Sequence, residues 1–404
     1  MSGSLKRSGA SDLQGATRLV VDAVAGLTDV VEELHRNISG LAPIVGPSRE
    51  GGTRGIPRLV YGSVRGVTRA VGLGLDAALS RLTPLLCPTD SSPRREAVLA
   101  ALNGVIGDYL AETGSALAIP LELRAAGRLL TPETSTGDRL LLMVHGLCMG
   151  DLQWSRNGHD HGAALGLELG FKPVYVNYNT GLHISTNGHA LSAALERLTG
   201  EWPVPVRELV VVAHSMGGLV ARSALHAASL AGASWPRLLT KVVFLGTPHH
   251  GAALERAGNW VVILGSISPY SAPIARLGRI RSSGIRDLRH GNLRDEDWQR
   301  PDRDHTHDPR APLPLPAGPS YFAVAASKAS AKGRRTGDGL VSVPSALGRH
   351  GDPLRSLSIP AERTAVFQGL DHFALLDDPG VFERLRGWLG ADGAHGAPEG
   401  SVVG

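Results

Sequence analysis

Residues 209–219 read Leu-Val-Val-Val-Ala-His-Ser-Met-Gly-Gly-Leu, the most informative stretch of the chain. An apolar, β-branched run ends abruptly in Ala213-His214-Ser215-Met216-Gly217, and residues 219–228, which can form a helix, follow. The pattern predicts a buried strand, a tight turn with Ser215 at its tip, and a helix. Small residues flank the turn because strand and helix must approach each other closely there.

Strand-like and helical runs alternate through most of the remaining chain. This alternation predicts a mostly parallel sheet with helices on both faces. A helix is expected at 188–198, just before the serine-bearing strand, and one or two edge strands in 121–130. The predicted sheet strands are 140–144, 173–178, 209–213, 241–245, 321–325 and 363–367.

Two more polar residues follow predicted strands, as Ser215 does. Asp338 lies in Gly337-Asp338-Gly339, beyond the strand at 321–325, and His372 follows the strand at 363–367. The carboxyl ends of parallel strands share one edge of a sheet, so we expect these side chains near Ser215. The chain order of serine, acid and histidine suits a nucleophile with an oriented general base.

Two further turns complete the pattern. The run 140–144 leads into His145-Gly146-Leu147, and the run 242–245 ends in Gly246-Thr247-Pro248-His249-His250-Gly251. Together these motifs, over residues 140–389, resemble α/β-hydrolase lipases and esterases. The resemblance includes bacterial lipases and the deacylases related to the GPI inositol-deacylase family. It does not extend to the first hundred or so residues, and Ala213 stands where the turn motif often has glycine.

The resemblance implies an α/β-hydrolase fold and a role for each motif residue. Ser215 would be the nucleophile, His372 the general base and Asp338 the acid that orients it. The backbone N–H groups of Leu147 and Met216 would form the oxyanion hole.

Other residues compete for these roles. Asp352 and Asp371 are alternatives to Asp338, but Asp371 is badly placed to reach the ring of its direct neighbour His372. Among the histidines, we expect His214 to point elsewhere on the turn. His145, His249 and His250 are expected to have structural roles, and Cys148 to be a small apolar filler.

The expected reaction is hydrolysis of a carboxylic ester, with an acyl ester or lipid as substrate, through an acyl-enzyme and without cofactor or metal. The same residues could pass the acyl group to an alcohol or a thiol, as in an acyltransferase or thioesterase. A third interpretation is a non-catalytic scaffold or surface-binding protein, which would have no need of Ser, Asp and His in this order.

Composition limits the remaining possibilities. A chain of 404 residues suggests two domains, and 42% hydrophobic with 19% charged residues supports a sizeable core. Only Cys87 and Cys148 are present, so no disulfide framework is implied. The net charge of +4 does not indicate nucleic-acid binding. Neither a signal peptide nor a membrane-spanning run is recognisable, which predicts a cytoplasmic protein.

The domain prediction has three parts. Residues 1–116 form an N-terminal helical region, 117–390 the α/β-hydrolase domain, and 391–404 a flexible tail. Within the domain, the interval 252–316 is expected to be an insertion that forms a lid over Ser215. It contains a polar cluster that could suggest a metal site, although its charged, Pro-rich surroundings favour a solvated loop: Asp302, Asp304, His305, His307 and Asp308. The oligomeric state is not readable from the sequence.

One predicted N-terminal helix, beginning at Pro57, carries Arg58, Arg65 and Arg69 on the side opposite its valines. This arginine face could be a solvated surface of a packed helix, or it could attach peripherally to an anionic membrane or lipid body. Four nearby glycines would weaken an isolated helix, which favours the packed alternative.

Overall fold

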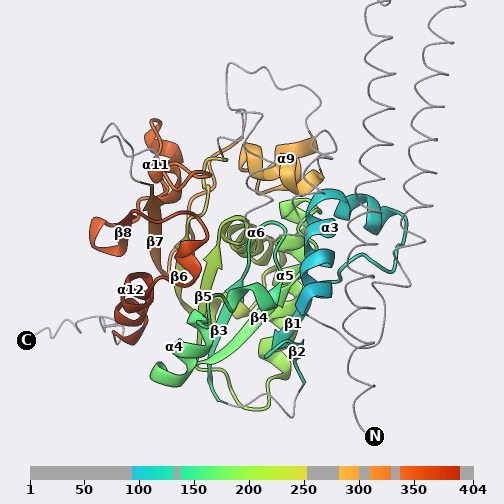
Figure 1. Cartoon of the computed structure of the whole chain (residues 1–404), viewed down its shortest axis with the longest axis horizontal. Coiled ribbons are helices and arrows are strands. Elements are labelled where there is room, and N and C mark those ends of the chain that lie inside the picture. The colour runs from blue at the N-terminus through green and yellow to red at the C-terminus, as the bar shows by residue number, and fades with distance from the viewer. Residues whose placement is uncertain (1–92, 132–136, 253–281, 300–309, 329–336, 392–404) are drawn as a thin grey trace, which may run out of the picture.

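The computed structural model describes residues 93–131, 137–252, 282–299, 310–328 and 337–391 (Figure 1). An eight-stranded sheet lies at its centre, in the order β2-β1-β4-β3-β5-β6-β7-β8. The strands are β1 (Glu122–Ala125), β2 (Arg128–Leu129), β3 (Arg139–Val144), β4 (Lys172–Asn177), β5 (Glu208–His214), β6 (Leu239–Leu245), β7 (Ser320–Ser327) and β8 (Thr364–Gln368). The helices of eight or more residues are α3 (Pro93–Glu112), α4 (His161–Leu169), α5 (Ile184–Glu201), α6 (Met216–Ala231), α9 (Ser283–His290) and α12 (Pro379–Gly390).

The sheet is mostly parallel, as the alternation of strand and helix predicts. Every neighbouring pair from β4 through β3, β5, β6 and β7 to β8 is parallel. Only β1 runs antiparallel, to both β2 and β4. The predicted edge region at 121–130 therefore forms a hairpin that extends the sheet beyond β4.

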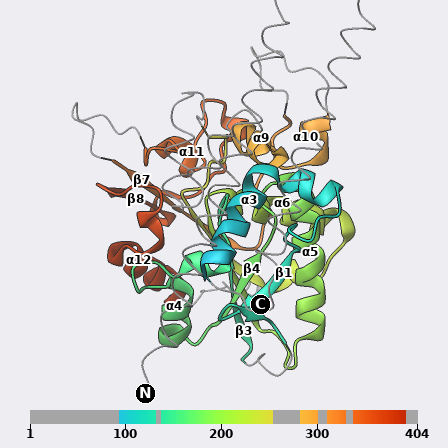
Figure 2. The same cartoon turned by 45° about the vertical axis from the view of Figure 1, so that its right-hand side comes forward.

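Helices cover both faces of the sheet (Figure 2). Alternate residues of β3 point to opposite sides: Leu140 and Leu142 pack in one core with α3, α5 and α6, whereas Leu141 and Met143 pack in a second core with α4 and α12. This period of two is expected of strands buried on both faces. The result is a three-layer arrangement of helices, sheet and helices.

Helix α3 belongs to the larger of these cores, because Leu102, Val105 and Ile106 are buried with residues of the sheet. Gly104 on this helix faces Cys148, and any side chain on Gly104 would overlap the thiol. Asn103 fixes the following segment by donating to the carbonyl of Leu117 at 2.8 Å and accepting from the amide of Ile119 at 2.9 Å. The predicted helices upstream of α3 lie outside the described residues.

The described part of the interval 252–316 contains α9 and the short α10 (Asp295–Gln299), and both are anchored to the domain. Ser283 donates to Asp108 of α3 through its amide and its hydroxyl. Trp298 stacks on His183, with ring centroids 3.7 Å apart. The remainder of the predicted lid and the cluster at 302–308 lie outside the described residues. Across the part that is described, no helix is long and apolar enough to cross a bilayer and no group of side chains resembles a metal site.

Candidate active site

Ser215 occupies a strained turn between β5 and α6. Its backbone has φ 54° and ψ −123°, a left-handed conformation that non-glycine residues rarely adopt. The amide of Ser215 donates to the carbonyl of Leu245 at 2.8 Å, which ties the turn to the end of β6. Strain of this kind costs about 1–3 kcal/mol and persists only where the surroundings enforce it.

Two glycines at the start of α6 make this turn sterically feasible. A Cβ atom on Gly217 would overlap the carbonyl oxygens of Val144 and His145, and one on Gly218 would overlap the side chain of Thr247. The helix therefore begins in direct contact with the backbone at the end of β3. This close approach is the physical reason for the small residues expected beside the serine.

Asp338 and His372 form a buried pair at the same edge of the sheet. His372 Nδ1 donates to Asp338 Oδ2 at 2.7 Å, and both residues are about 98–99% shielded from solvent. The other carboxylate oxygen accepts from the amides of Leu340 and Val341, each at 2.8 Å. A histidine that donates from Nδ1 keeps Nε2 as the nitrogen able to accept a proton.

His372 lies close to two residues that adjoin the serine turn, Gly246 and His214. A Cβ atom on Gly246, at the end of β6, would lie 3.1 Å from His372 Cε1. His214 approaches with its ring centroid 4.7 Å from that of His372, and its Nε2 donates to the His372 carbonyl at 3.2 Å. His372 therefore contacts His214 and Gly246, which adjoin Ser215 and its hydrogen-bond partner Leu245 in the chain.

The two alternative acids are engaged elsewhere. Asp371 accepts from the amides of Phe373 and Ala374 at 3.0 and 2.9 Å, which caps a short turn. Asp352 accepts from the amide of Leu354 at the start of another turn. Asp338 is the carboxylate that contacts the His372 ring.

The loop that carries Leu147 passes directly over Ser215. A Cβ atom on Gly146 would lie 3.0 Å from Ser215 Cβ. The Tyr178 hydroxyl donates to the His145 carbonyl at 2.8 Å, and the Cys148 amide donates to Thr180 Oγ1 at 3.1 Å. Sequence reasoning missed these two supports, although both residues directly follow β4 at the edge where functional groups gather.

Residues 188–302 match the model of a family described as PGAP1-like alpha/beta domain. This description agrees with the mostly parallel sheet flanked by helices on both faces. No curated protein matches the chain. The match includes most of α5, then β5, the serine turn, α6, β6, α9 and α10.

Several solved structures are partly similar to this chain. The lipase BlEst2 of Bacillus licheniformis in its mature form is 18% identical, with 66% of this chain and 99% of that chain covered and a TM-score of 0.41. EstA from Clostridium botulinum is 12% identical, with coverages of 63% and 87% and a TM-score of 0.40. An esterase of Pyrobaculum calidifontis is 13% identical, with coverages of 76% and 93% and a TM-score of 0.37.

The other buried titratable groups around Ser215 are uncharged near neutral pH. Burial lowers the pKa of His145 to about 4, and burial together with the neighbouring His372 lowers the pKa of His214 well below its ordinary value. Burial raises the pKa of the Cys148 thiol, which therefore stays protonated. These groups are poorly suited to accept a proton or act as nucleophile at neutral pH.

Proposed function

We propose that this chain is a serine hydrolase that cleaves carboxylic esters through an acyl-enzyme. The observation that carries the proposal is the buried 2.7 Å hydrogen bond between His372 and Asp338 beside the strained Ser215. A general base oriented by a carboxylate, close to a serine hydroxyl held on a tight turn, is the arrangement that nucleophilic acyl transfer requires.

In the proposed reaction, His372 Nε2 removes the proton from Ser215 Oγ as this oxygen attacks the ester carbonyl. Asp338 holds the imidazole in the required tautomer and stabilises the imidazolium that forms. His372 then returns the proton to the departing alcohol. Water repeats the sequence on the acyl-enzyme, releasing the carboxylic acid and restoring the serine.

The developing oxyanion would be stabilised by the N–H groups of Leu147 and Met216. Met216 is the first residue of α6, where an N–H has no acceptor within the helix. The loop of Leu147 is positioned over Ser215 by Gly146 and held by Tyr178 and Thr180. Removing one such donor typically costs about 10²–10³-fold in turnover.

The deciding experiment measures hydrolysis of p-nitrophenyl esters from short to long acyl chains. Ser215→Ala should abolish turnover, whereas Ser229→Ala should retain it, because Ser229 is exposed near the far end of the same helix. Equal activity of wild type and Ser215→Ala would refute the proposal. A competing alcohol in the same assay distinguishes a hydrolase from an acyltransferase, since only the latter would give mainly the transesterified product.

A further inference from the structure

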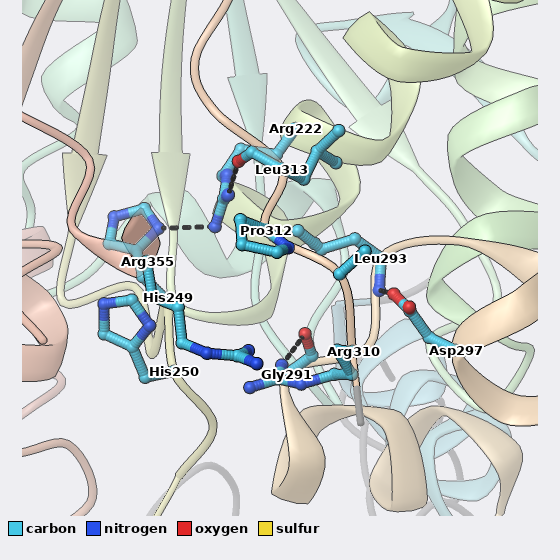
Figure 3. Close-up of a pocket in the computed structure, with 11 residues that line it drawn as sticks. Arg222, His249, His250, Gly291, Leu293, Asp297, Arg310, Pro312, Leu313 and Arg355 are labelled. Carbon is cyan, nitrogen blue, oxygen red and sulfur yellow. Dashed lines mark hydrogen bonds between the residues drawn. The ribbon is translucent and has the colours of Figure 1, made fainter. Parts of the chain in front are cut away.

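A small pocket lined by arginine and histidine side chains contains none of the candidate active-site residues (Figure 3). It is formed by α6, the turn after β6, and residues from 291–297 and 310–313. The charged or titratable side chains that line it are Arg222, His249, His250, Asp297, Arg310 and Arg355. Three of the six are arginines from separate parts of the chain, whereas burial lowers the pKa of His250 to about 4 and that of His249 well below its ordinary value.

Arg222 is the buried member of this group, with only 5% of its surface exposed. Its guanidinium donates to the carbonyl of Leu313 at 2.6 Å and to His249 Nδ1 at 3.4 Å. Both partners are neutral acceptors. Burying a cation without a counter-charge is costly, so arginine is usually paired when it is buried.

Two buried donors in this pocket have no hydrogen-bond partner among the residues that the structure describes. One is the Nε atom of Arg222. The other is Nε2 of His249, which carries the ring proton because Nδ1 accepts from Arg222. Leaving buried donors unsatisfied costs about 1–3 kcal/mol each, which a ligand with acceptor oxygens would relieve.

The acidic residue in the lining is already engaged. Asp297 accepts from the amides of Leu293 and Arg294 and from the side chain of Arg294 at 3.1 Å. Burial and the charge of Arg310 lower the pKa of Arg222 to about 9, although Asp297 contributes in the opposite direction. Burial is the larger cause of this lowering, Tyr321 also opposes it, and Arg355 in the same lining pairs with Asp352 at 3.5 Å.

The backbone at Gly291 leaves room for a second guanidinium in the pocket, that of Arg310. Arg310 donates to the carbonyl of Gly291, and a Cβ atom on Gly291 would lie 2.6 Å from the same Arg310 nitrogen. Gly291 has φ 68°, a conformation that favours glycine. A side chain at position 291 would displace Arg310 from the pocket.

The size of the pocket limits what it can hold. Its cavity volume is about 30 Å³. This exceeds the roughly 10–15 Å³ that one bound water needs but is far below the roughly 300–1,000 Å³ of a drug-sized ligand site. The space suits a small ion or a single charged group at the end of a larger molecule.

We propose that this pocket binds a small oxyanion, a phosphate or a carboxylate group, on Arg222, His249, Arg310 and Arg355. Planar guanidinium groups match the geometry of both anions, and charge-assisted hydrogen bonds are the stronger kind. The anion is either a free ion or a charged group of an ester substrate, and the kinetic test below distinguishes the two. The site is independent of the proposed hydrolase activity, because none of its side chains belongs to the Ser215, His372 and Asp338 set.

The first test titrates the full chain with inorganic phosphate and follows thermal unfolding and calorimetric heat, with sodium chloride at matched ionic strength as reference. Phosphate should raise the Tm saturably, beyond any effect of chloride. Arg355→Gln should raise the half-saturating phosphate concentration at least about tenfold, equivalent to about 1.4 kcal/mol. Arg207→Gln is the matched control, because this exposed arginine pairs with Asp138 before β5, outside the pocket.

Arg222→Lys keeps the charge but loses the planar fork, and it should also weaken phosphate binding. Arg355→Gln decides the result if Arg222→Lys does not fold. A phosphate effect no larger than that of chloride, or a phosphate affinity unchanged by Arg355→Gln, would overturn the proposal.

A kinetic arm distinguishes the two sources of the anion and rests on the proposed function. If the substrate supplies the group, Arg355→Gln should raise KM for a carboxylate-bearing ester such as mono-p-nitrophenyl glutarate but not for p-nitrophenyl acetate. If a free anion is bound, both KM values should stay unchanged while the phosphate effect on Tm is lost. The phosphate titration does not depend on esterase activity. It can therefore refute oxyanion binding whether or not the chain hydrolyses esters.

Discussion

At the scale of single residues, the carboxylate of Asp338 is fixed by three donors. Two are backbone amides on one oxygen, and the third is His372 Nδ1 on the other. Glycines at 337 and 339, with φ 106° and 102°, allow the tight turn that presents the carboxylate. The ring of His372 is thereby oriented by the backbone of a turn, through Asp338.

Replacing this carboxylate by an amide should impair chemistry without unfolding the protein. In Asp338→Asn the amide oxygen can keep the backbone bonds, but an NH₂ group facing His372 would favour the wrong imidazole tautomer. We expect kcat for a p-nitrophenyl ester to fall by about 10³–10⁴-fold. Asp371→Asn is the control, because its side chain only caps a turn one residue from His372. Comparable losses in both variants would argue against Asp338 as the orienting acid.

At the scale of elements, the serine turn depends on how closely α6 approaches β3. The amide of Ser215 is bound to the end of β6, while Gly217 faces carbonyl oxygens at and just beyond the end of β3. Carbonyl groups at a strand end cannot rotate away as a flexible side chain can. The start of α6 is therefore held at a fixed distance from the sheet.

Gly217→Ala should destabilise the protein by about 1–3 kcal/mol or more, because the added methyl group overlaps fixed backbone. Gly200→Ala makes the same chemical change near the end of α5, where a Cβ atom would meet nothing within 4 Å. That control should be neutral or stabilising by up to about 1 kcal/mol. Urea unfolding of the two variants measures the difference. A loss of stability in both, or in neither, would contradict the steric explanation.

The sequence predicted strands well where an apolar run ends in a turn with small or polar residues. Residues 209–213 and 241–245 fall within β5 and β6, because burial on both faces demands continuous apolar residues. The pairing of β1 between β2 and β4, and the burial of α3 in the main core, depend on contacts between distant segments. The periodicity of hydrophobic residues within one segment does not predict such contacts.

At the site, the sequence indicated which residue types follow which strands, and the structure places His372 against Asp338. Their bond length, the support from Tyr178 and the burial of Arg222 follow from tertiary packing and were not predictable. Arg222 in particular reads as an ordinary polar residue of an amphipathic helix. Its environment becomes visible only when residues 249 and 313 are brought to it.

At the scale of the whole molecule, the fold contains several histidines that are held neutral by burial. His145 and His161 are fully buried, and burial lowers the pKa of each to about 4. In the unfolded chain both should titrate near 6.5. Between pH 6.5 and 4 the unfolded state therefore binds more protons than the folded state, and stability must fall as the pH falls through this window.

We expect the free energy of unfolding to decline between pH 6.5 and 4, with His161 contributing up to about 3 kcal/mol of the total. Urea unfolding at a series of pH values measures this decline. His161→Gln should reduce the slope of the unfolding free energy against pH by the equivalent of up to one proton. His189→Gln should leave this slope unchanged, because the His189 side chain is 51% exposed. Stability that is constant from pH 7 to pH 5 would show that these buried histidines do not control acid sensitivity.

At Ser215, whose backbone is in the left-handed region, selection for stability and selection for ester turnover should favour different residues. Glycine adopts such a conformation without penalty, so Ser215→Gly should relax the turn while removing the hydroxyl group. A library screened for heat resistance alone should enrich this substitution, and a library screened for ester turnover should eliminate it. The residue found at position 215 would thus indicate whether a population of variants had been selected for heat resistance or for ester turnover.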